Sequence, residues 1–262
     1  MKLGVSSLFA IARGFKYLLK HLEPHLDSFE ALEVLDEGAT KLNEERLRKL
    51  KDLAKTYDLE LSLHAPFIDV NPASLSPFMR KASLKHLSRS LARASKLECS
   101  VWVMHGGYYP HPKVRALAHR LSLASINKLA KLAEDLGVKV AIENDPAIEG
   151  CLLVKAEEAR ELVEEALGRR VGLCLDLGHA NTAHEVEAFF EVAGDLVIHV
   201  HAHDNDAKRD LHLTPGEGSI DWRKVVDRIT RLGFKGGIIV ETEGEPWTGL
   251  MRLREWLTAS EA

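Results

Sequence analysis

The densest group of residues that could do chemistry lies in the segment 199–212. It reads His-Val-His-Ala-His-Asp-Asn-Asp-Ala-Lys-Arg-Asp-Leu-His and holds four histidines and three aspartates. An apolar Leu-Val-Ile run precedes it at 196–198, and Thr-Pro-Gly-Glu-Gly follows at 214–218. Imidazole and carboxylate groups are the ligands that divalent Zn, Mn and Fe prefer. The pattern predicts a strand that leaves a core and delivers metal ligands at its carboxyl end.

Five other apolar runs end in a residue of the same kind. These residues are His64, His105, Glu143, Asp176 and Glu241. With His201 from the first segment, six successive predicted strands each deliver one metal-type ligand. A single histidine-rich loop could simply be solvated. Six such strand ends in a row favour a shared site, because charged groups are uncommon at buried strand ends unless they are paired or coordinated.

The elements that must position these residues alternate between strand and helix. Short apolar runs predict strands at 2–6, 31–35, 59–63, 100–104, 139–142, 171–175, 196–201 and 237–240. Apolar residues at helical spacing predict helices at 8–26, 43–57, from 77 for about twenty residues, and at 113–136, 156–167, 183–193, 221–232 and 247–258. Asn43 and Asp221 are suitable helix caps.

Eight strand–helix units without a linker predict an α/β fold, a single (β/α)8 TIM barrel that forms one domain over residues 1–262. A doubly wound open sheet is the alternative, and the first turn lacks the glycine-rich phosphate fingerprint of that fold. In a barrel, the carboxyl ends of all strands meet at one rim, where active sites lie. Alternation along 171–176 turns Asp176 away from the face of Leu173 and Leu175.

Composition narrows the class of protein. The chain has 262 residues, 45% of them hydrophobic, and a formal net charge of −4, so it lacks a global basic field that would gather nucleic acid. The three cysteines are Cys99, Cys151 and Cys174, an odd and sparse set that predicts a reducing compartment. With no signal-peptide pattern and no apolar run long enough to cross a bilayer, we expect a cytoplasmic protein without a membrane partner.

The strand-end residues resemble the motifs of the xylose-isomerase-like TIM-barrel superfamily. This superfamily joins sugar and sugar-phosphate isomerases and epimerases to the endonuclease IV type of abasic-site nuclease. The matching motifs are collinear over about residues 60–245. They are His64-Ala65-Pro66, His105-Gly106-Gly107, Glu143-Asn144, Asp176-Leu177-Gly178-His179, His201-Ala202-His203-Asp204, Asp210-Leu211-His212, Gly216-Glu217-Gly218 and Glu241. Each motif is weak alone, and the ordered set is specific.

The resemblance implies two alternative sites. The isomerase and epimerase branch implies one divalent ion (Zn, Mn, Co or Mg) on Glu143, Asp176, His201 and Glu241. In that branch Glu143 and Glu241 also move a proton at the carbon beside the substrate carbonyl. The nuclease branch implies up to three zinc ions on nine ligands. Those nine are His64, His105, Glu143, Asp176, His179, His201, Asp210, His212 and Glu241.

Other residues receive supporting roles in this interpretation. His179, Lys208, Arg209 and Trp247 are candidate substrate contacts, and Arg209 with Lys208 could bind a substrate phosphate. His203 and Asp204 are expected to orient the loop after the seventh strand. His199, one layer deeper than His201, is expected to be a hydrogen-bonded core histidine. In a site with one ion, the remaining five of the nine residues would bind substrate hydroxyls or phosphate. They are His64, His105, His179, Asp210 and His212.

The balance of motifs favours a divalent-metal-dependent sugar or sugar-phosphate isomerase or epimerase. The segment 216–222, Gly-Glu-Gly-Ser-Ile-Asp-Trp, is similar to proteins of that branch. The loop at 36–40 is acidic, whereas a loop that enters DNA should be basic or polar. An endonuclease IV-like phosphodiesterase remains the alternative, and DNA is a partner only in that case. A non-catalytic sugar- or metal-binding barrel is the third hypothesis. Phe67 and Ile68 could form an apolar wedge or the wall of a sugar pocket.

Overall fold

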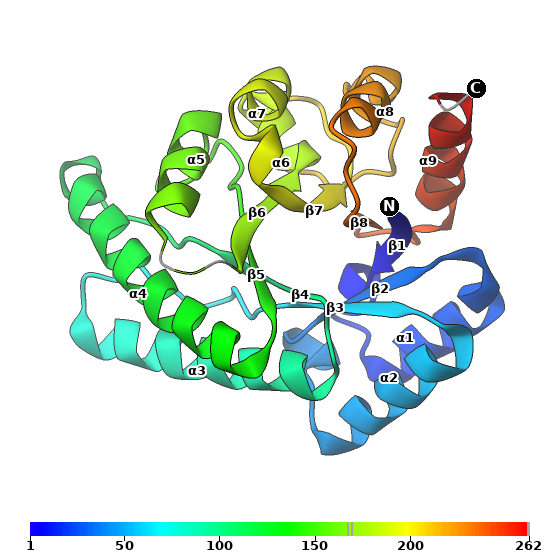
Figure 1. The fold of residues 1–262 in the computed structure, drawn as a ribbon, viewed down its shortest axis with the longest axis horizontal. Helices are drawn as coiled ribbons and strands as arrows, with labels where there is room; N and C mark the ends of the chain where they lie inside the picture. The colour runs from blue at the N-terminus through cyan, green and yellow to red at the C-terminus, as the bar shows by residue number, and fades with distance from the viewer. Residues whose placement is uncertain (167, 169, 261–262) are drawn as a thin grey trace.

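The computed structural model describes residues 1–166, 168 and 170–260, and Figure 1 shows their fold. Eight strands in this part of the chain lie in sequence order around a closed barrel. All pairs are parallel, and β1 closes the barrel by pairing with both β2 and β8. Helices surround the strands on the outside (Figure 1). The predicted TIM barrel is therefore confirmed. Across the described residues, no helix is long and apolar enough to cross a bilayer.

The strands are short and lie within one residue of their predicted bounds. They are β1 (Lys2–Ser6), β2 (Ala31–Leu35), β3 (Glu60–His64), β4 (Val101–His105), β5 (Lys139–Glu143), β6 (Val171–Asp176), β7 (Val197–Ala202) and β8 (Gly237–Val240). Strands β3 to β6 extend one residue further than predicted at their carboxyl ends. His64, His105, Glu143 and Asp176 are consequently the last residues of paired strands, so regular backbone pairing fixes where their side chains start.

The helices follow the strands with clear start and stop signals. They are α1 (Phe15–Leu22), α2 (Glu44–Tyr57), α3 (Pro77–Lys96), α4 (Arg115–Leu136), α5 (Ala156–Glu165), α6 (Leu177–Thr182), α7 (Val186–Val192), α8 (Trp222–Arg231) and α9 (Trp247–Ser260). The side chains of Asn43 and Asp221 accept hydrogen bonds from the third backbone N–H of α2 and α8, so both predicted caps are confirmed. Gly137, with φ of 74°, ends α4 in the left-handed conformation.

Two predicted helices are interrupted. The predicted helix 8–26 is replaced by the 3₁₀ turn Ser7–Ala10, then α1, then the 3₁₀ turn Glu23–Ser28. Gly14, with φ of 93°, breaks the first part, and a proline lies at the start of the last turn. The predicted helix 183–193 begins later, as α7, and is preceded by α6, which was not predicted. Periodicity missed α6 because it has six residues and begins directly at the end of β6.

The predicted helix 156–167 corresponds to α5, which ends at Glu165; residue 167 lies outside the described residues. Inside the barrel, a small apolar cluster of Val101, Val103, Ala141 and Cys174 packs against Ile198. The large apolar cluster lies outside it and joins the strands to the helices. The interior above the small cluster holds buried polar side chains, and this polar layer leads directly to the carboxyl rim.

Candidate functional site

The six predicted strand-end residues lie together at the carboxyl end of the barrel. β3 to β6 end in their residues, His201 is the penultimate residue of β7, and Glu241 directly follows β8. Five of the six are almost fully buried, with exposed fractions of 0–4%: His64, Glu143, Asp176, His201 and Glu241. Ionised carboxylates at this depth are costly unless a positive partner compensates them. At this rim, therefore, several buried charges lie together and each carboxylate needs a positive partner.

Glu143, Asp176, His201 and Glu241 form one compact group, with their candidate ligand atoms within 4.8 Å of one another. Nδ1 of His201 lies 3.1 Å from Oε1 of Glu143 and 3.0 Å from Oε2 of Glu241. The same nitrogen lies 3.7 Å from Oδ2 of Asp176. Three carboxylates thus converge on one imidazole nitrogen. The four residues assigned to a single ion by resemblance are brought together by the fold.

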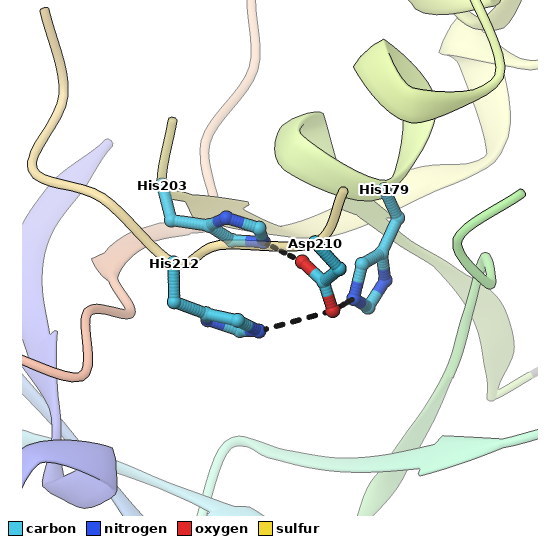
Figure 2. A group of neighbouring side chains, drawn as sticks. All are labelled: His179, His203, Asp210 and His212. Atoms are coloured by element: carbon cyan, nitrogen blue, oxygen red, sulfur yellow. Dashed lines mark ion pairs between the residues drawn. The ribbon is translucent and has the colours of Figure 1, made fainter. Parts of the chain in front are cut away.

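A second group sits beside the first and is drawn in Figure 2. His179, His203, Asp210 and His212 point toward one another, with His179 coming from α6 and the other three from the loop that follows β7. Oδ2 of Asp210 lies 3.3 Å from Nε2 of His179 and 3.4 Å from Nε2 of His212. His203 stacks on His212 with ring centroids 3.9 Å apart. His203 was predicted to orient the loop, and it also belongs to this candidate ligand group.

A third group consists of His64, His105 and Glu143. Oε2 of Glu143 lies 3.0 Å from Nε2 of His64 and 3.4 Å from Nε2 of His105. Because Oε1 of the same carboxylate faces His201, Glu143 spans two groups. Nδ1 of His105 in turn lies 3.1 Å from Asp145, which orients the ring. The nine ligand-type residues, joined by His203, therefore form three adjoining groups at one rim.

The spacing of the motifs has local structural causes. Asp176 is the N-cap of α6, and its Oδ1 accepts a hydrogen bond from the backbone N–H of His179 at 2.6 Å. A cap and the third helical residue are three positions apart, which accounts for the Asp-Leu-Gly-His motif. Asn144 binds the backbone N–H and C=O of Asp176 through its side-chain amide. The Glu143-Asn144 motif thereby joins the end of β5 to the end of β6.

The titration of the site reflects burial opposed by neighbouring charge. Burial raises the pKa of the Glu143 carboxyl, but His105 and His201 outweigh burial and hold that pKa well below its usual range. Burial also raises the pKa of Asp176, and His179 and His203 bring it below its usual value. Burial lowers the pKa of His64, yet its hydrogen bond to Glu143 raises the pKa to about 9. Carboxylates are thus held ionised, and imidazolium protons balance them.

This donor set fits a divalent cation. Among the described residues that line the cavity here, the charged partners of the carboxylates are histidines, without a lysine or arginine. Nδ1 of His203 and Oδ1 of Asp210 are buried and have no hydrogen-bond partner among the described residues. Carboxylate oxygens with imidazole nitrogens suit Zn, Mn, Co or Fe, and metal binding displaces protons from such ligands. A cation could therefore take over the compensation that imidazolium protons supply.

A cavity of about 260 Å³ opens over these groups. Its floor carries residues of all three groups, including Glu143, Asp210 and Glu241. Its upper wall is apolar and is formed by Leu8, Leu35, Phe67, Val70, Tyr108 and Pro146. Phe67 therefore lines the pocket, while Ile68 next to it is 51% exposed. The cavity offers a polar floor that can hold hydroxyl groups and an apolar wall that can pack against carbon atoms.

Three predicted substrate contacts lie away from the cavity lining. Arg209 is exposed and forms an ion pair with Asp206 at 2.8 Å, and Lys208 is exposed beside it. The loop turns around Asp206, whose carboxylate accepts hydrogen bonds from the backbone N–H groups of Lys208 and Arg209. The side chains of these two residues consequently face outward. The ring of Trp247 stacks on His25 with centroids 3.9 Å apart and packs against the core. His179, the fourth predicted contact, does line the cavity.

Asp204 occupies a loop-organising position. Its buried carboxylate accepts hydrogen bonds from the backbone N–H groups of Asn205, Gly216 and Ile220 and from the indole N–H of Trp222. The long loop after β7 is folded back onto the end of that strand by these bonds. Because Asp210 and His212 belong to this loop, Asp204 sets where they lie. These hydrogen bonds are the contacts that the orienting role predicted for Asp204 requires, and the role itself stays a prediction.

Sequence reasoning missed three residues that contact the site. Ser6, the last residue of β1, donates a hydrogen bond from Oγ to Oε1 of Glu241 at 3.0 Å. Asp145 orients His105, and Glu33 lies inside the barrel against His199 and His201. A lone acid in the apolar run at 31–35 was the available signal for Glu33. Ser6 carried no signal, because a serine at a strand end is unremarkable in a sequence.

Known proteins provide an independent comparison. A family model described as "Xylose isomerase-like TIM barrel" matches residues 26–260. The protein MJ1311 of Methanocaldococcus jannaschii is 33% identical over 248 residues, covering 93% of this chain and 84% of that protein. Fructoselysine 3-epimerase of Escherichia coli O157:H7 is 24% identical over 202 residues, covering 74% of this chain and 72% of the enzyme.

Solved structures agree with this relationship. The structure of a D-tagatose 3-epimerase-like protein superposes with a TM-score of 0.94 at 31% identity, covering all of this chain and 98% of the other. A D-psicose 3-epimerase determined in the presence of D-fructose shares the fold, with a TM-score of 0.81 at 20% identity over all of this chain and 98% of the other. The family match, the barrel and the ordered rim agree: the chain belongs to the xylose isomerase-like TIM-barrel family.

Proposed function

We propose that the protein is a divalent-metal-dependent sugar isomerase or epimerase. The observation that carries the proposal is the meeting of Glu143 and Glu241 on the same imidazole, His201, beneath a cavity. Two carboxylates on either side of a bound carbon skeleton suit removal and return of a proton. Relatives named as 3-epimerases of psicose and of fructoselysine support a reaction of this class.

The proposed reaction uses the chain's own groups as acid and base. One of the two glutamates takes the proton from the carbon beside the carbonyl, and the other or the same one returns it. The neighbouring histidines outweigh burial and keep both carboxylates ionised, so either can begin as the base. A divalent cation on Glu143, Asp176, His201 and Glu241 would act as a Lewis acid that polarises the substrate oxygens. His64 and His179 line the cavity floor and are suited to bind substrate hydroxyls.

We propose a neutral sugar rather than a sugar phosphate as the substrate. A phosphate is normally bound by arginine, lysine or backbone N–H groups. The described residues that line the cavity include neither of these cations, and Arg209 is engaged with Asp206 outside it. The carboxylates of the floor would also repel a phosphate dianion unless several cations were present. An apolar wall over a polar floor suits an uncharged sugar.

The test offers metal-loaded protein a panel of aldoses and ketoses, each with its phosphorylated form, in deuterated water. We expect deuterium to enter a neutral sugar at the carbon beside its carbonyl, together with formation of an isomer or epimer. Exchange should be faster for the neutral sugar than for its phosphate. Metal-loaded protein that exchanges no sugar in the panel would refute the proposed function.

The three adjoining ligand groups favour a second candidate, an endonuclease IV-like zinc-dependent phosphodiesterase. Glu143 belongs to two of the groups, and Asp210 contacts His179 and His212 in the remaining group, which suits up to three ions. Several ions could hold a phosphodiester and an attacking water without a lysine or arginine. Zinc-loaded protein is therefore also tested on a DNA duplex with one abasic site. Cleavage 5′ to that site with no sugar exchange would select this candidate over the isomerase.

A further inference from the structure

Glu33 is a buried carboxylate one layer below the ligand groups. It lies in the middle of β2, faces into the barrel, and is 0% exposed. Its Oε2 accepts hydrogen bonds from Oγ of Ser62 and from Nε2 of His199, both at 2.9 Å. Two strands on opposite sides of the barrel therefore hold one of its oxygens in place. The other oxygen is left to face a different residue.

That residue is His201. Oε1 of Glu33 lies 2.8 Å from Nε2 of His201, whose other ring nitrogen faces Glu143 and Glu241. Neither Oε1 of Glu33 nor Nε2 of His201 meets hydrogen-bond geometry with any described residue, each other included. The contact between the two atoms is therefore an ion pair by distance, and no other described group holds either atom. The two nitrogens of His201 thus face two different carboxylate environments, one below it and one at the rim.

The tautomer of a histidine is decided by what its second nitrogen meets. A carboxylate beside Nε2 favours a proton on that nitrogen, which leaves a lone pair on Nδ1. That lone pair then points to the carboxylates of Glu143 and Glu241, where a cation would lie. Partners of this kind orient metal-binding histidines in proteins and raise the basicity of the ligand.

We propose that Glu33 is a positioning residue that fixes the ring and the tautomer of His201 for metal binding. This inference rests on the metal site of the proposed function. A purely structural explanation is available, in which Glu33 only joins β2 to β3 and β7 inside the barrel. The two explanations differ in what they predict for the metal site when Glu33 loses its charge but keeps its size.

Glu33→Gln makes this change. The amide oxygen is expected to take the position of Oε2, where it can accept from Ser62 and His199, which turns the NH₂ group toward His201. Nε2 of His201 would then have to accept, and the proton would move to Nδ1, where it blocks the cation. We expect the affinity for Zn²⁺ or Co²⁺ to fall about 10- to 100-fold, as for other residues that orient metal ligands.

Asp36→Asn is the matched control. Asp36 directly follows β2, is also 0% exposed, and forms an ion pair with Arg93 at 2.8 Å and a hydrogen bond with the backbone of Leu42. Its substitution removes a buried charge from the same part of the fold and changes only the side chain, whereas the hydrogen bond from Asp36 to the C=O of His64 is made by the backbone N–H and is kept. We expect this variant to lose thermal stability while it keeps the cation affinity within about two-fold, which is well below the effect of an altered ligand partner.

The experiment measures Co²⁺ and Zn²⁺ affinity by chelator competition, the visible absorption spectrum of the Co²⁺ form, and thermal unfolding by circular dichroism. Weaker binding and a shifted Co²⁺ spectrum in Glu33→Gln, but not in Asp36→Asn, support the inference. Unchanged affinity and spectrum in a folded Glu33→Gln protein overturn it. Should Glu33→Gln not fold, Glu33→Asp decides, because it keeps the charge but draws it away from His201: altered binding supports the inference, and native binding overturns it.

The result separates this inference from the proposed function. If the unsubstituted protein binds neither Co²⁺ nor Zn²⁺, the metal-dependent function fails, and the role of Glu33 in metal positioning fails with it. If the unsubstituted protein binds the cation and exchanges a sugar, but Glu33→Gln binds equally well, the function stands and the inference alone is refuted.

Discussion

The two ends of the barrel treat charge in opposite ways. At the amino end, a hollow is lined by Glu60, Asp195, Lys139 and Lys235, so both signs are present. Lys2 pairs there with Glu60 at 3.0 Å, and their side chains remain 47% and 35% exposed. At the carboxyl end, the carboxylates are buried, and the described residues that line the cavity balance them with histidines.

The difference teaches which charges are available to a ligand. A lysine or arginine keeps its proton at any ordinary pH. The acids at the amino end are therefore either paired with a permanent positive charge or hydrated by solvent. A histidine can lose its proton near neutral pH, and a cation can then replace it. The same fold therefore carries inert ion pairs at one end and exchangeable ones at the other. Each prediction below tests one side of this contrast.

The largest effect is expected from Glu241→Gln at the carboxyl end. The substitution keeps the size of the side chain but removes a base, so turnover of the sugar should fall by about 10²- to 10⁴-fold. Turnover and metal content are measured on the same sample, because Glu241 is also a candidate ligand. A Glu241→Gln protein with full metal content and native turnover would show that the chemistry lies on another residue.

Asp204→Asn should have the next largest effect. Three buried N–H donors and the part-buried N–H of Gly216 meet the two carboxylate oxygens, and an amide leaves two of the four without an acceptor. At about 1–3 kcal/mol for each of the two unsatisfied donors, the free energy of unfolding should fall by about 2–6 kcal/mol. Chemical denaturation measures this loss. Asp206→Asn, in the more exposed part of the same loop, is the control and should leave the free energy of unfolding nearly unchanged, because exposed ion pairs contribute little.

Removal of the cation should destabilise the protein by a smaller amount. A ligand present at about 100 times its dissociation constant stabilises the folded state by about 2.7 kcal/mol. For a chain of this size, we expect a chelator to lower the melting temperature by about 5–10 °C. Differential scanning calorimetry with and without chelator checks this value. Equal melting temperatures would mean that imidazolium protons alone compensate the buried acids.

Lys2→Ala at the amino end should have the smallest effect. The ion pair with Glu60 is exposed on both sides, and such pairs contribute about 0–1 kcal/mol. Turnover and metal affinity should stay within experimental error of the native values, while denaturation detects at most a small loss. A clear drop in metal affinity would break the proposed contrast, because it would couple the two ends of the barrel.

Much of the rim could be predicted from the sequence because a barrel converts chain order into position. A ligand at the end of each parallel strand must arrive at the same rim, whatever the loops do. This is why His64, His105 and Glu143, which are far apart in the chain, could be grouped before a structure was known. The helix caps at Asn43 and Asp221 were equally readable, because capping depends on neighbours only three residues away.

The remaining features depend on contacts that spacing does not encode. Lys208 and Arg209 follow the ligand-rich strand, yet the turn around Asp206 directs them outward. Trp247 begins α9, and its partner His25 comes from a distant turn. Glu33 was visible as an acid in an apolar strand, but its role depends on β7, which lies across the barrel. Loop direction and cross-barrel contacts are set by tertiary packing.

The hydrogen bond between Ser6 and Glu241 has a consequence for how the protein folds. Its two residues lie 235 positions apart, so the bond joins the first strand to the residue after the last strand. Bringing such distant segments together is entropically slow and belongs to the late stages of folding. The Glu241 carboxylate is thus held in place only after the first and last strands have met. The time course of cation binding during refolding would therefore follow closure of the barrel. A folding intermediate that precedes closure would lack a correctly placed Glu241 ligand.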